Sequence, residues 1–247
     1  MALNCLFRQS HGPEMSNFSL RTTVVLLWSL VPCLAIWVGL FQIKSAAWTY
    51  FLYHGLCLLP AIIWGRRLWL PTFLLPTRQH FALITAVALL FSAGTLIGYE
   101  LIGKLLFSNE HALALLKQYG GSTEMLVALG AYTVLVNPVF EELFWRGVIL
   151  NELDKSKAPF KHFGLCWSSC AYAALHYVIF RMLLSQGWAA VLTLIHVFYG
   201  ALLAVIYRRT GSILTTILAH GLLTDLAFIV VLLDLFRHYP DFFFKLL

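Results

Sequence analysis

The residues with the greatest chemical capacity lie in one apolar stretch, residues 137–147, which reads Asn-Pro-Val-Phe-Glu-Glu-Leu-Phe-Trp-Arg-Gly. Glu141, Glu142 and Arg146 are its charged groups, and the run around them is otherwise hydrophobic enough to enter a membrane. On the most lenient insertion scale, a carboxylate at the bilayer centre costs about 2.5 kcal/mol or more. Buried acids of this kind need partners, and they usually mark a site of proton or water chemistry.

The two glutamates differ in the partners that a helix offers them. Adjacent helical residues point about 100° apart, so Glu141 and Glu142 face different directions. Glu142 precedes Arg146 by four residues, which is the favourable order for an ion pair on one helix face. Glu141 has no basic residue at that spacing, so it is the better candidate for a general base acting on water. Pro138 removes a helical hydrogen bond just before the pair and is expected to kink or open the helix there.

Polar residues in later apolar runs are candidates for the opposite wall of such a site. His176, His196 and His220 lie in three separate runs, where a histidine must find a polar partner. His176 and His220 are the favoured functional residues, with a hydrogen-bonded structural role as the alternative. Thr224 follows His220 by four residues and shares its helix face, whereas Asp225 is a further buried carboxylate one residue later. The other histidines are interpreted as loop residues without a functional signal: His54, His80, His111, His162 and His238.

Composition places these groups in a membrane protein. The chain has 247 residues, of which 60% are hydrophobic and 11% are charged, whereas a soluble domain carries about 25% charged residues. The expected fold class is therefore an all-α, polytopic transmembrane helix bundle of about seven spans, with six to eight as the range. The apolar runs of spanning length are near residues 22–43, 46–64, 81–103, 124–145, 163–184, 188–207 and 212–235.

The runs divide the chain into four parts. Residues 1–21 form a polar N-terminal segment, and residues 22–119 contain accessory transmembrane helices and an amphipathic segment. Residues 120–235 form the membrane core that holds every candidate group, and residues 236–247 form a C-terminal tail. The first run is too long for the apolar part of a signal peptide. Lys and Arg are more frequent on the side that holds the N-terminus, so that end is expected in the cytoplasm.

The net charge of +6 does not indicate a nucleic-acid partner. The basic residues are scattered among the expected loops and form no stripe that would follow a phosphate backbone. They are better interpreted as determinants of membrane topology. The expected partners are therefore the lipid bilayer and a membrane-bound protein or peptide.

Together these residues resemble the motifs of the CPBP family, the CAAX-protease and bacteriocin-processing (Abi) membrane proteases. The sequence Glu-Glu-x-x-x-Arg that begins at Glu141 resembles the family's signature. The sequence Tyr-Ala-Ala-Leu-His that ends at His176 resembles its Phe-x-x-x-His motif, with Tyr in place of Phe. Residues 200–220 resemble its last two core helices, joined by a basic-Thr-Gly turn. The resemblance covers about residues 120–235, and it is the order and spacing of the motifs that make it specific.

One position departs from the family pattern. The family's last motif is His-x-x-x-Asn or His-x-x-x-Asp, but here Thr224 occupies the fourth position after His220 and the acid follows at Asp225. A threonine hydroxyl can still donate a hydrogen bond, and a local irregularity of the helix can bring Asp225 round to the same face. Both residues are therefore candidates for the fourth catalytic position.

The resemblance implies a glutamate-type intramembrane endopeptidase. In that role Glu141 would deprotonate a water molecule held by His176. His220, together with Thr224 or Asp225, would stabilise the tetrahedral oxyanion. The neighbouring Glu–Arg pair would orient the site, and no cofactor is expected.

Three alternatives remain from the sequence. Glu141, His176, His196 and His220 offer zinc ligands for a metal-dependent protease, although the His-Glu-x-x-His motif is absent. The departure at Thr224 allows a catalytically inactive scaffold or regulator with the same fold. A proton-coupled transporter is the least favoured reading, because no inverted repeat is visible.

The substrate is not encoded in any one motif. Members of the family trim a tripeptide after a prenylated cysteine, process peptides such as bacteriocin precursors, or cut protein-sorting tails. The compact chain and short loops favour a bacterial-type member in an inner or cell membrane, for which a prenylated substrate is less expected.

Overall fold

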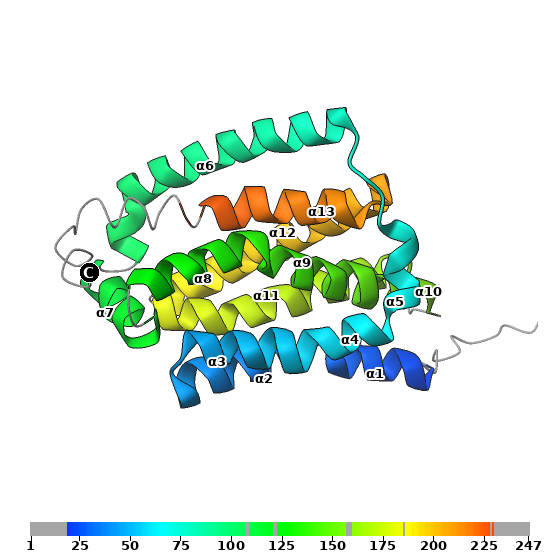
Figure 1. Cartoon of the computed structure of the whole chain (residues 1–247), viewed down its shortest axis with the longest axis horizontal. Coiled ribbons are helices and arrows are strands. Elements are labelled where there is room, and N and C mark those ends of the chain that lie inside the picture. The colour runs from blue at the N-terminus through cyan, green and yellow to red at the C-terminus, as the bar shows by residue number, and fades with distance from the viewer. Residues whose placement is uncertain are drawn as a thin grey trace, which may run out of the picture.

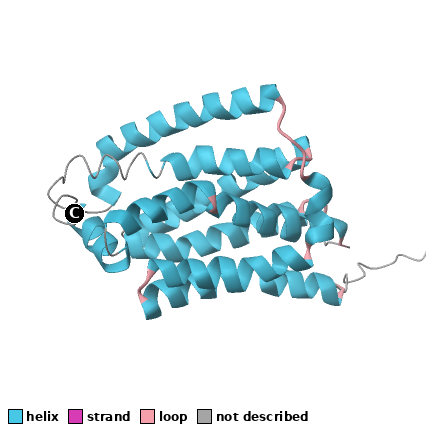
Figure 2. Cartoon of the chain, viewed as in Figure 1, coloured by secondary structure: helices cyan, strands magenta, loops and turns pink. Residues whose placement is uncertain are grey.

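The computed structural model describes residues 19–106, 109–120, 123–156, 160–184, 186–227 and 229. All regular elements in these ranges are helices, and none is a strand (Figures 1 and 2). The predicted all-α fold class is therefore confirmed. Most of the polar N-terminal segment and the whole expected tail, residues 236–247, lie outside the described residues.

Within the described residues, six apolar helical stretches are long enough to cross a bilayer, which makes the chain a multi-pass integral membrane protein. This number lies within the predicted range. A seventh apolar helix, Ile213–Asp225, is shorter, and the predicted seventh span continues into residues that the structure does not describe. The six stretches are Leu20–Ile43, Ala46–Trp64, Arg78–Gly103, Val127–Lys155, Phe163–Leu183 and Gly187–Thr210.

The first two spans form a helical hairpin at one edge of the bundle, blue to cyan in Figure 1. Lys44, with a φ of 57°, turns the chain, and Ser45 caps the returning helix by accepting from the Trp48 amide. Gly39 allows close packing of the hairpin, because a Cβ there would lie 2.6 Å from the Cα of Thr49. The hairpin consists of α1 (Leu20–Trp28), α2 (Val31–Trp37), η1 (Val38–Ile43), α3 (Ala46–Tyr50), η2 (Phe51–Leu58) and α4 (Leu59–Trp64).

The third span lies along the opposite edge of the bundle, where it packs against residues 213–225 (Figure 1). It is the long helix α6 (Arg78–Leu106), reached through α5 (Arg66–Trp69) and the short 3₁₀-helix η3 (Leu70–Thr72). Only a narrow strip that includes Ile84, Ala88 and Ser92 is buried, and large apolar side chains cover the exposed remainder. In a membrane this exposed face is suited to lipid. The following α7 (Asn109–Gly120) occupies the segment that was expected to be amphipathic and too polar to span.

The second half of the chain supplies the centre of the bundle. The fourth span breaks at Val136, two residues before Pro138, so the predicted irregularity upstream of the glutamates is present. Residues 141–150 are all buried, including the charged ones, as expected of ionisable groups that face the interior of a membrane bundle. The helices are α8 (Thr123–Leu135), α9 (Asn137–Glu142), η4 (Leu143–Leu150), α10 (Asn151–Lys155), α11 (Phe163–Leu183), α12 (Gln186–Thr210), α13 (Ile213–His220) and η5 (Gly221–Asp225).

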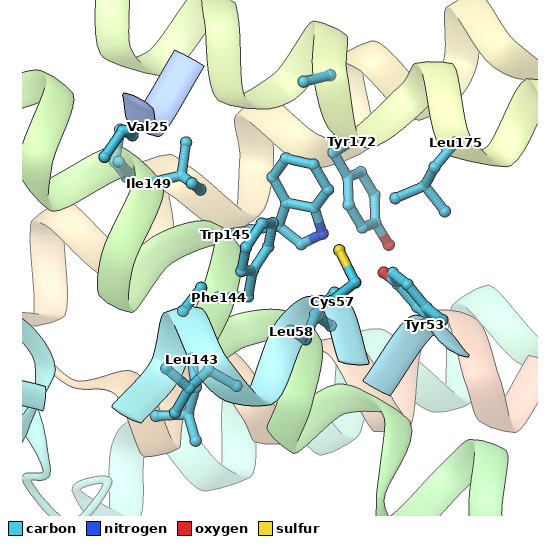
Figure 3. Packing of buried hydrophobic residues seen from close by; sticks show 14 of the residues in the cluster. Val25, Tyr53, Cys57, Leu58, Leu143, Phe144, Trp145, Ile149, Tyr172 and Leu175 are labelled. Carbon is cyan, nitrogen blue, oxygen red and sulfur yellow. The ribbon is translucent and has the colours of Figure 1, made fainter. Parts of the chain in front are cut away.

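A large aromatic cluster holds the second, fourth and fifth spans together. Trp145 is fully buried, and its ring meets Tyr172 edge to face at a centroid distance of 5.9 Å. Tyr53, Cys57 and Leu58 of η2 belong to the same buried cluster (Figure 3). Burial of rings of this size is worth several kcal/mol and fixes the helices against one another. This packing sets the position of Tyr53 relative to the glutamates.

Candidate active site

Three π-helical segments adjoin the site and carry Tyr53, Arg146 and Asp225, whereas Glu141, Glu142 and His220 lie on α-helices. These segments are η2 in the second span, η4 in the fourth and η5 after α13. A π-helix bonds residue i to i+5 and occurs frequently at functional sites. It changes which side chains share a helix face, so the site cannot be derived from α-helical spacing alone.

Arg146 is held by partners from three helices. Its Nη1 donates to Glu142 Oε1 at 2.7 Å, so the ion pair predicted from their spacing is present. Its Nη2 donates to the Gly200 carbonyl at 3.1 Å, and its guanidinium lies 4.9 Å from the centre of the Tyr172 ring. Glu142 and Arg146 are 0% and 1% exposed. A buried ion pair requires this extra bonding to offset the loss of hydration.

His220 lies between the two glutamates. Its Nδ1 is 2.8 Å from Glu142 Oε1. Glu142 is ion-paired with Arg146 and can only accept, so this nitrogen carries a proton. The other nitrogen, Nε2, faces a different set of oxygens. It is 3.7 Å from Glu141 Oε2, 3.8 Å from Asp225 Oδ1 and 3.5 Å from the Tyr172 hydroxyl.

Glu141 is held at one oxygen only. The Tyr53 hydroxyl donates to its Oε1 at 2.9 Å. Its Oε2 has no hydrogen-bond partner among the described residues. Glu141 is only 3% exposed, so bulk solvent does not supply that partner freely. Buried polar atoms without partners are rare in folded proteins and call for a specific explanation. Glu142 Oε2 and Asp225 Oδ2 share this property, and Glu141 Oε2 is distinguished from them by its approach to His220 Nε2 at 3.7 Å.

The fourth position is divided between Thr224 and Asp225 in an unexpected way. The Thr224 hydroxyl donates to the His220 carbonyl at 3.0 Å and lies 3.0 Å from the Tyr199 hydroxyl. Asp225 instead turns toward the His220 ring, because the π-helix η5 stacks residue i+5 over residue i. Gly221 lets η5 approach the break in the fourth span, since a Cβ there would lie 3.0 Å from the Val134 carbonyl oxygen.

His176 lies beside this cluster without joining the glutamates. Its Nδ1 is 2.9 Å from the Tyr172 carbonyl, which can only accept, so Nδ1 carries the proton and Nε2 is left as an acceptor. Its ring lies 4.5 Å from the Tyr172 ring and 4.8 Å from the ring of His196. No hydrogen bond or ion pair connects His176 to Glu141 or Glu142 in the part of the chain that the structure describes.

Two residues of the second span were missed from the sequence. Tyr53 reaches Glu141 directly, and His54, which had been interpreted as a loop residue, is 2% exposed within η2. The interpretation of His54 was wrong because its apolar neighbours place it inside the span 46–64. A tyrosine and a histidine side by side in a membrane run were the available signal, since each needs a buried partner.

A mainly apolar cavity of about 430 Å³ lies beside Phe140, the residue that precedes the glutamates. It lies between α3 and η2 on one side and α8 and α9 on the other. Polar groups in its wall are already bonded: the Tyr50 hydroxyl to Thr133 at 2.8 Å, and His54 to the Tyr132 hydroxyl at 2.7 Å. The cavity is therefore suited to an apolar group that needs no hydrogen bonds.

The proposed zinc ligands do not converge in the described residues. No three His, Cys, Asp or Glu side chains there are arranged to hold a metal ion.

Comparison with known protein families gives a match for the part of the chain that carries the two glutamates and the histidines of the site. Residues 123–224 match a family model described as type II CAAX prenyl endopeptidase Rce1-like. The match begins at α8 and ends within η5, and it includes Glu141, Arg146, His176 and His220. The resemblance drawn from the motifs is thereby confirmed for this region. No curated protein and no solved structure matches the chain.

Proposed function

We propose that this chain, whose residues 123–224 belong to the Rce1-like type II CAAX prenyl endopeptidase family of peptidases, is an intramembrane endopeptidase that cleaves with a glutamate-activated water. One observation carries the proposal. The buried Glu141 Oε2 has no hydrogen-bond partner among the described residues and faces His220 Nε2 at 3.7 Å. A water molecule to one side of this pair, about 2.8 Å from each atom, would hydrogen-bond to both.

Glu141 acts as the general base in this mechanism. Its Oε2 takes one proton from the water as the water oxygen attacks the scissile carbonyl carbon. The Tyr53 hydroxyl keeps Oε1 occupied and so directs Oε2 toward the water. His176, with its proton on Nδ1, offers Nε2 as an acceptor for the second water proton. When the C–N bond breaks, Glu141 returns its proton to the departing amine.

His220 and Tyr172 are the proposed oxyanion donors. The His220 Nε2 and the Tyr172 hydroxyl lie 3.5 Å apart, close enough to address one oxygen together. Protonated His220 donates from Nε2, because Glu142 already accepts from its Nδ1. Fixed donors that face a developing negative charge typically contribute 10²–10³-fold each. Asp225, next to the same nitrogen, supports the imidazolium form during this step.

The substrate is proposed to be a membrane-bound protein or peptide with apolar residues near the scissile bond. The cavity beside Phe140 would receive such a group from the bilayer side of the site. A cytoplasmic N-terminus is part of this proposal on the basis of the Lys and Arg distribution, and a bacterial-type inner or cell membrane on the basis of the compact chain and short loops.

The decisive experiment compares wild type with Glu141→Gln, purified and reconstituted in liposomes with membrane peptides that carry apolar C-terminal tails. The variant keeps an acceptor for Tyr53 and loses the base, so cleavage is expected to fall about 10²–10⁴-fold. Glu110→Gln, on the exposed surface of α7, is the matched control and should cleave as wild type does. Equal cleavage by wild type and Glu141→Gln would leave the scaffold role as the better explanation.

Two further measurements address metal dependence and substrate. Activity that persists after dialysis against a strong chelator supports the metal-free mechanism, whereas loss that is restored by zinc supports the metal-dependent alternative. Membrane and secreted peptides of cells with wild type and with Glu141→Gln can be compared by mass spectrometry. Altered C-termini on several proteins indicate tail cleavage, and one unprocessed small peptide indicates peptide maturation.

A further inference from the structure

The orientation of the His220 imidazole is only partly fixed by hydrogen bonds. Its Nδ1 lies 2.8 Å from Glu142 Oε1, which secures one edge of the ring. On the other edge, Nε2 lies 3.5 Å from the Tyr172 hydroxyl, 3.7 Å from Glu141 Oε2 and 3.8 Å from Asp225 Oδ1, all longer than a typical hydrogen bond. One short bond alone leaves the ring able to swing about it, so packing contacts are needed to keep Nε2 turned toward Glu141.

Tyr199 of α12 makes such a contact with its ring. The ring centroids of Tyr199 and His220 are 6.1 Å apart and their planes meet at 82°, which is edge-to-face geometry. Tyr172 of α11 makes an equivalent contact with His220 at 6.1 Å and 88°, and the two tyrosine centroids are 6.4 Å apart. The three centroids form a nearly equal-sided triangle, so each ring restricts the tilt of the other two.

Tyr199 also holds the backbone of His220 through one intermediate. The Thr224 hydroxyl donates its only proton to the His220 carbonyl at 3.0 Å, so it accepts from the Tyr199 hydroxyl, also at 3.0 Å. His220 is the last residue of α13 and directly precedes the π-helix η5, so this carbonyl lies where the helical bonding pattern changes. Tyr199 thus reaches both the ring and the backbone of one site residue.

The surroundings of Tyr199 give it a firm base for this contact. Its side chain packs against two buried hydrophobic clusters, the large one around Trp145 and the smaller one that α6 covers. The next residue, Gly200, accepts from Arg146 through its carbonyl at 3.1 Å. The same turn of α12 is therefore bonded to Arg146 and packed on His220, although α12 supplies no group to the proposed water chemistry.

We propose that Tyr199 is a positioning residue for the peptidase reaction, whose ring keeps His220 Nε2 turned toward Glu141. This inference rests on the proposed function. Among the described residues, Tyr199 has no hydrogen bond to Glu141 or to His220 Nε2, so it acts through the orientation of His220. Its hydroxyl makes the smaller contribution, because Thr224 can bond to the His220 carbonyl without it.

The test uses Tyr199→Met in the liposome cleavage assay. Methionine is flexible and fills irregular space, so the aromatic ring is removed with little loss of packing. A misplacement of about 1 Å at a reacting group can cost about 10²-fold, and we expect kcat to fall about 10–100-fold with KM within about threefold. Wild-type kcat in Tyr199→Met, or a change confined to KM, would overturn the proposal.

Tyr199→Phe is the conservative variant. It keeps the ring and loses only the hydroxyl that bonds to Thr224. Its kcat should therefore stay within about threefold of wild type. A loss in Tyr199→Phe as large as that in Tyr199→Met would contradict a role for the ring.

Tyr207→Met is the matched control on the same helix. Tyr207 lies about two turns after Tyr199 on α12, and its hydroxyl accepts from Asn151 at 2.7 Å, so it too is tied to another helix. It is 4% exposed, whereas Tyr199 is half-buried, so the control should lose at least as much stability. Its kcat should stay within about twofold of wild type. Equal losses of kcat in Tyr199→Met and Tyr207→Met would assign the effect to loosening of α12 and overturn the proposal.

Nitrogen NMR of isotope-labelled histidine gives a readout that does not depend on turnover. The His220 ring signals are assigned by their loss in His220→Gln. Wild type and Tyr199→Phe should each show one sharp pair, and Tyr199→Met should show doubled or broadened signals. Unchanged signals in Tyr199→Met would contradict the proposal.

Two outcomes need a separate decision. Should Tyr199→Met fail to fold, Tyr199→Phe decides alone, and a loss of kcat of tenfold or more in that variant overturns the proposal. Failure of the proposed function is distinguishable, because Glu141→Gln would then retain activity. Failure of this inference alone leaves Glu141→Gln inactive and Tyr199→Met as active as wild type.

Discussion

The two ring nitrogens of His220 face two regions that are built in opposite ways. On the Nδ1 side lies the Arg146 cluster, which consists of Glu142, Arg146, the face of the Tyr172 ring and the Gly200 carbonyl, whereas the Tyr172 hydroxyl lies on the Nε2 side. Its polar contacts are 2.7–3.1 Å long, and its two charged residues are fully buried. On the Nε2 side lies the Glu141 cluster, which consists of Glu141, Tyr53 and Asp225. Its carboxylates approach Nε2 only to 3.7 and 3.8 Å.

This difference separates structural from chemical use of the same residue types. Glu141, Glu142 and Asp225 each keep one buried carboxylate oxygen without a hydrogen-bond partner among the described residues. The two clusters differ at the other oxygen, because Glu142 Oε1 accepts from Arg146 at 2.7 Å and from His220 at 2.8 Å, whereas Glu141 Oε1 accepts only from the uncharged Tyr53 hydroxyl. Buried charge is tolerated where it is paired and is reactive where it is not. His220 connects the two regions, because its bond to Glu142 determines which nitrogen is presented to Glu141.

The largest expected effect on stability comes from breaking the Arg146 cluster. Arg146→Met keeps the length of the side chain and leaves Glu142 as an uncompensated buried charge, which costs about 3–5 kcal/mol. Glu141→Gln should change stability by less than about 1 kcal/mol, since Glu141 makes no ion pair with Arg or Lys among the described residues. Reversible unfolding of the detergent-solubilised protein, followed by circular dichroism, measures both. Similar stability losses in the two variants would erase the distinction between the clusters.

Arg208→Met is the control for that measurement. Arg208 pairs with Asp154, but both side chains are about one-third exposed. Pairs of this kind contribute about 0–1 kcal/mol. A loss for Arg208→Met as large as that for Arg146→Met would mean that burial is not the cause.

The Arg146 cluster could largely be foreseen from sequence, because its central contact is local. Glu142 and Arg146 are one helical turn apart, and a spacing rule is enough to pair them. The all-helical fold could also be predicted, since a transmembrane helix is recognised from the length and composition of an apolar run. Contacts between residues one turn apart in the same helix are the ones that a single sequence predicts best.

The Glu141 cluster depends on contacts that no spacing rule provides. Tyr53 is 88 residues from Glu141 along the chain, and only the packing of two spans brings them together. Asp225 shares a face with His220 because η5 is π-helical, which a count at α-helical spacing does not predict. The sequence left Thr224 and Asp225 as equal alternatives, and the structure places only the carboxylate of Asp225 near the His220 ring nitrogen. Their catalytic roles remain predictions.

His176 offers the next test, because His196 makes the same kind of hydrogen bond and lies outside both clusters. His176 and His196 each hold a carbonyl four residues earlier through Nδ1, and their rings are neighbours. If His176 presents Nε2 to the water, His176→Gln should lower kcat about 10²-fold. His196→Gln should lower it by no more than about threefold. The liposome assay compares them, and equal losses would show that the histidine pair acts as a packing unit.

The smallest expected effects distinguish the two neighbours at the end of η5. Asp225→Asn keeps the size of the side chain and removes the charge beside His220 Nε2, so kcat should fall about tenfold. Thr224→Val removes the hydroxyl that bonds to Tyr199 and the His220 carbonyl, at a cost of about 1 kcal/mol in stability. Its effect on kcat should be clearly smaller. The reverse ranking in kcat would return the fourth position to Thr224 and would mean that the π-helix does not set the active geometry. The comparison therefore tests whether a single extra residue in a helical turn decides which side of His220 performs chemistry.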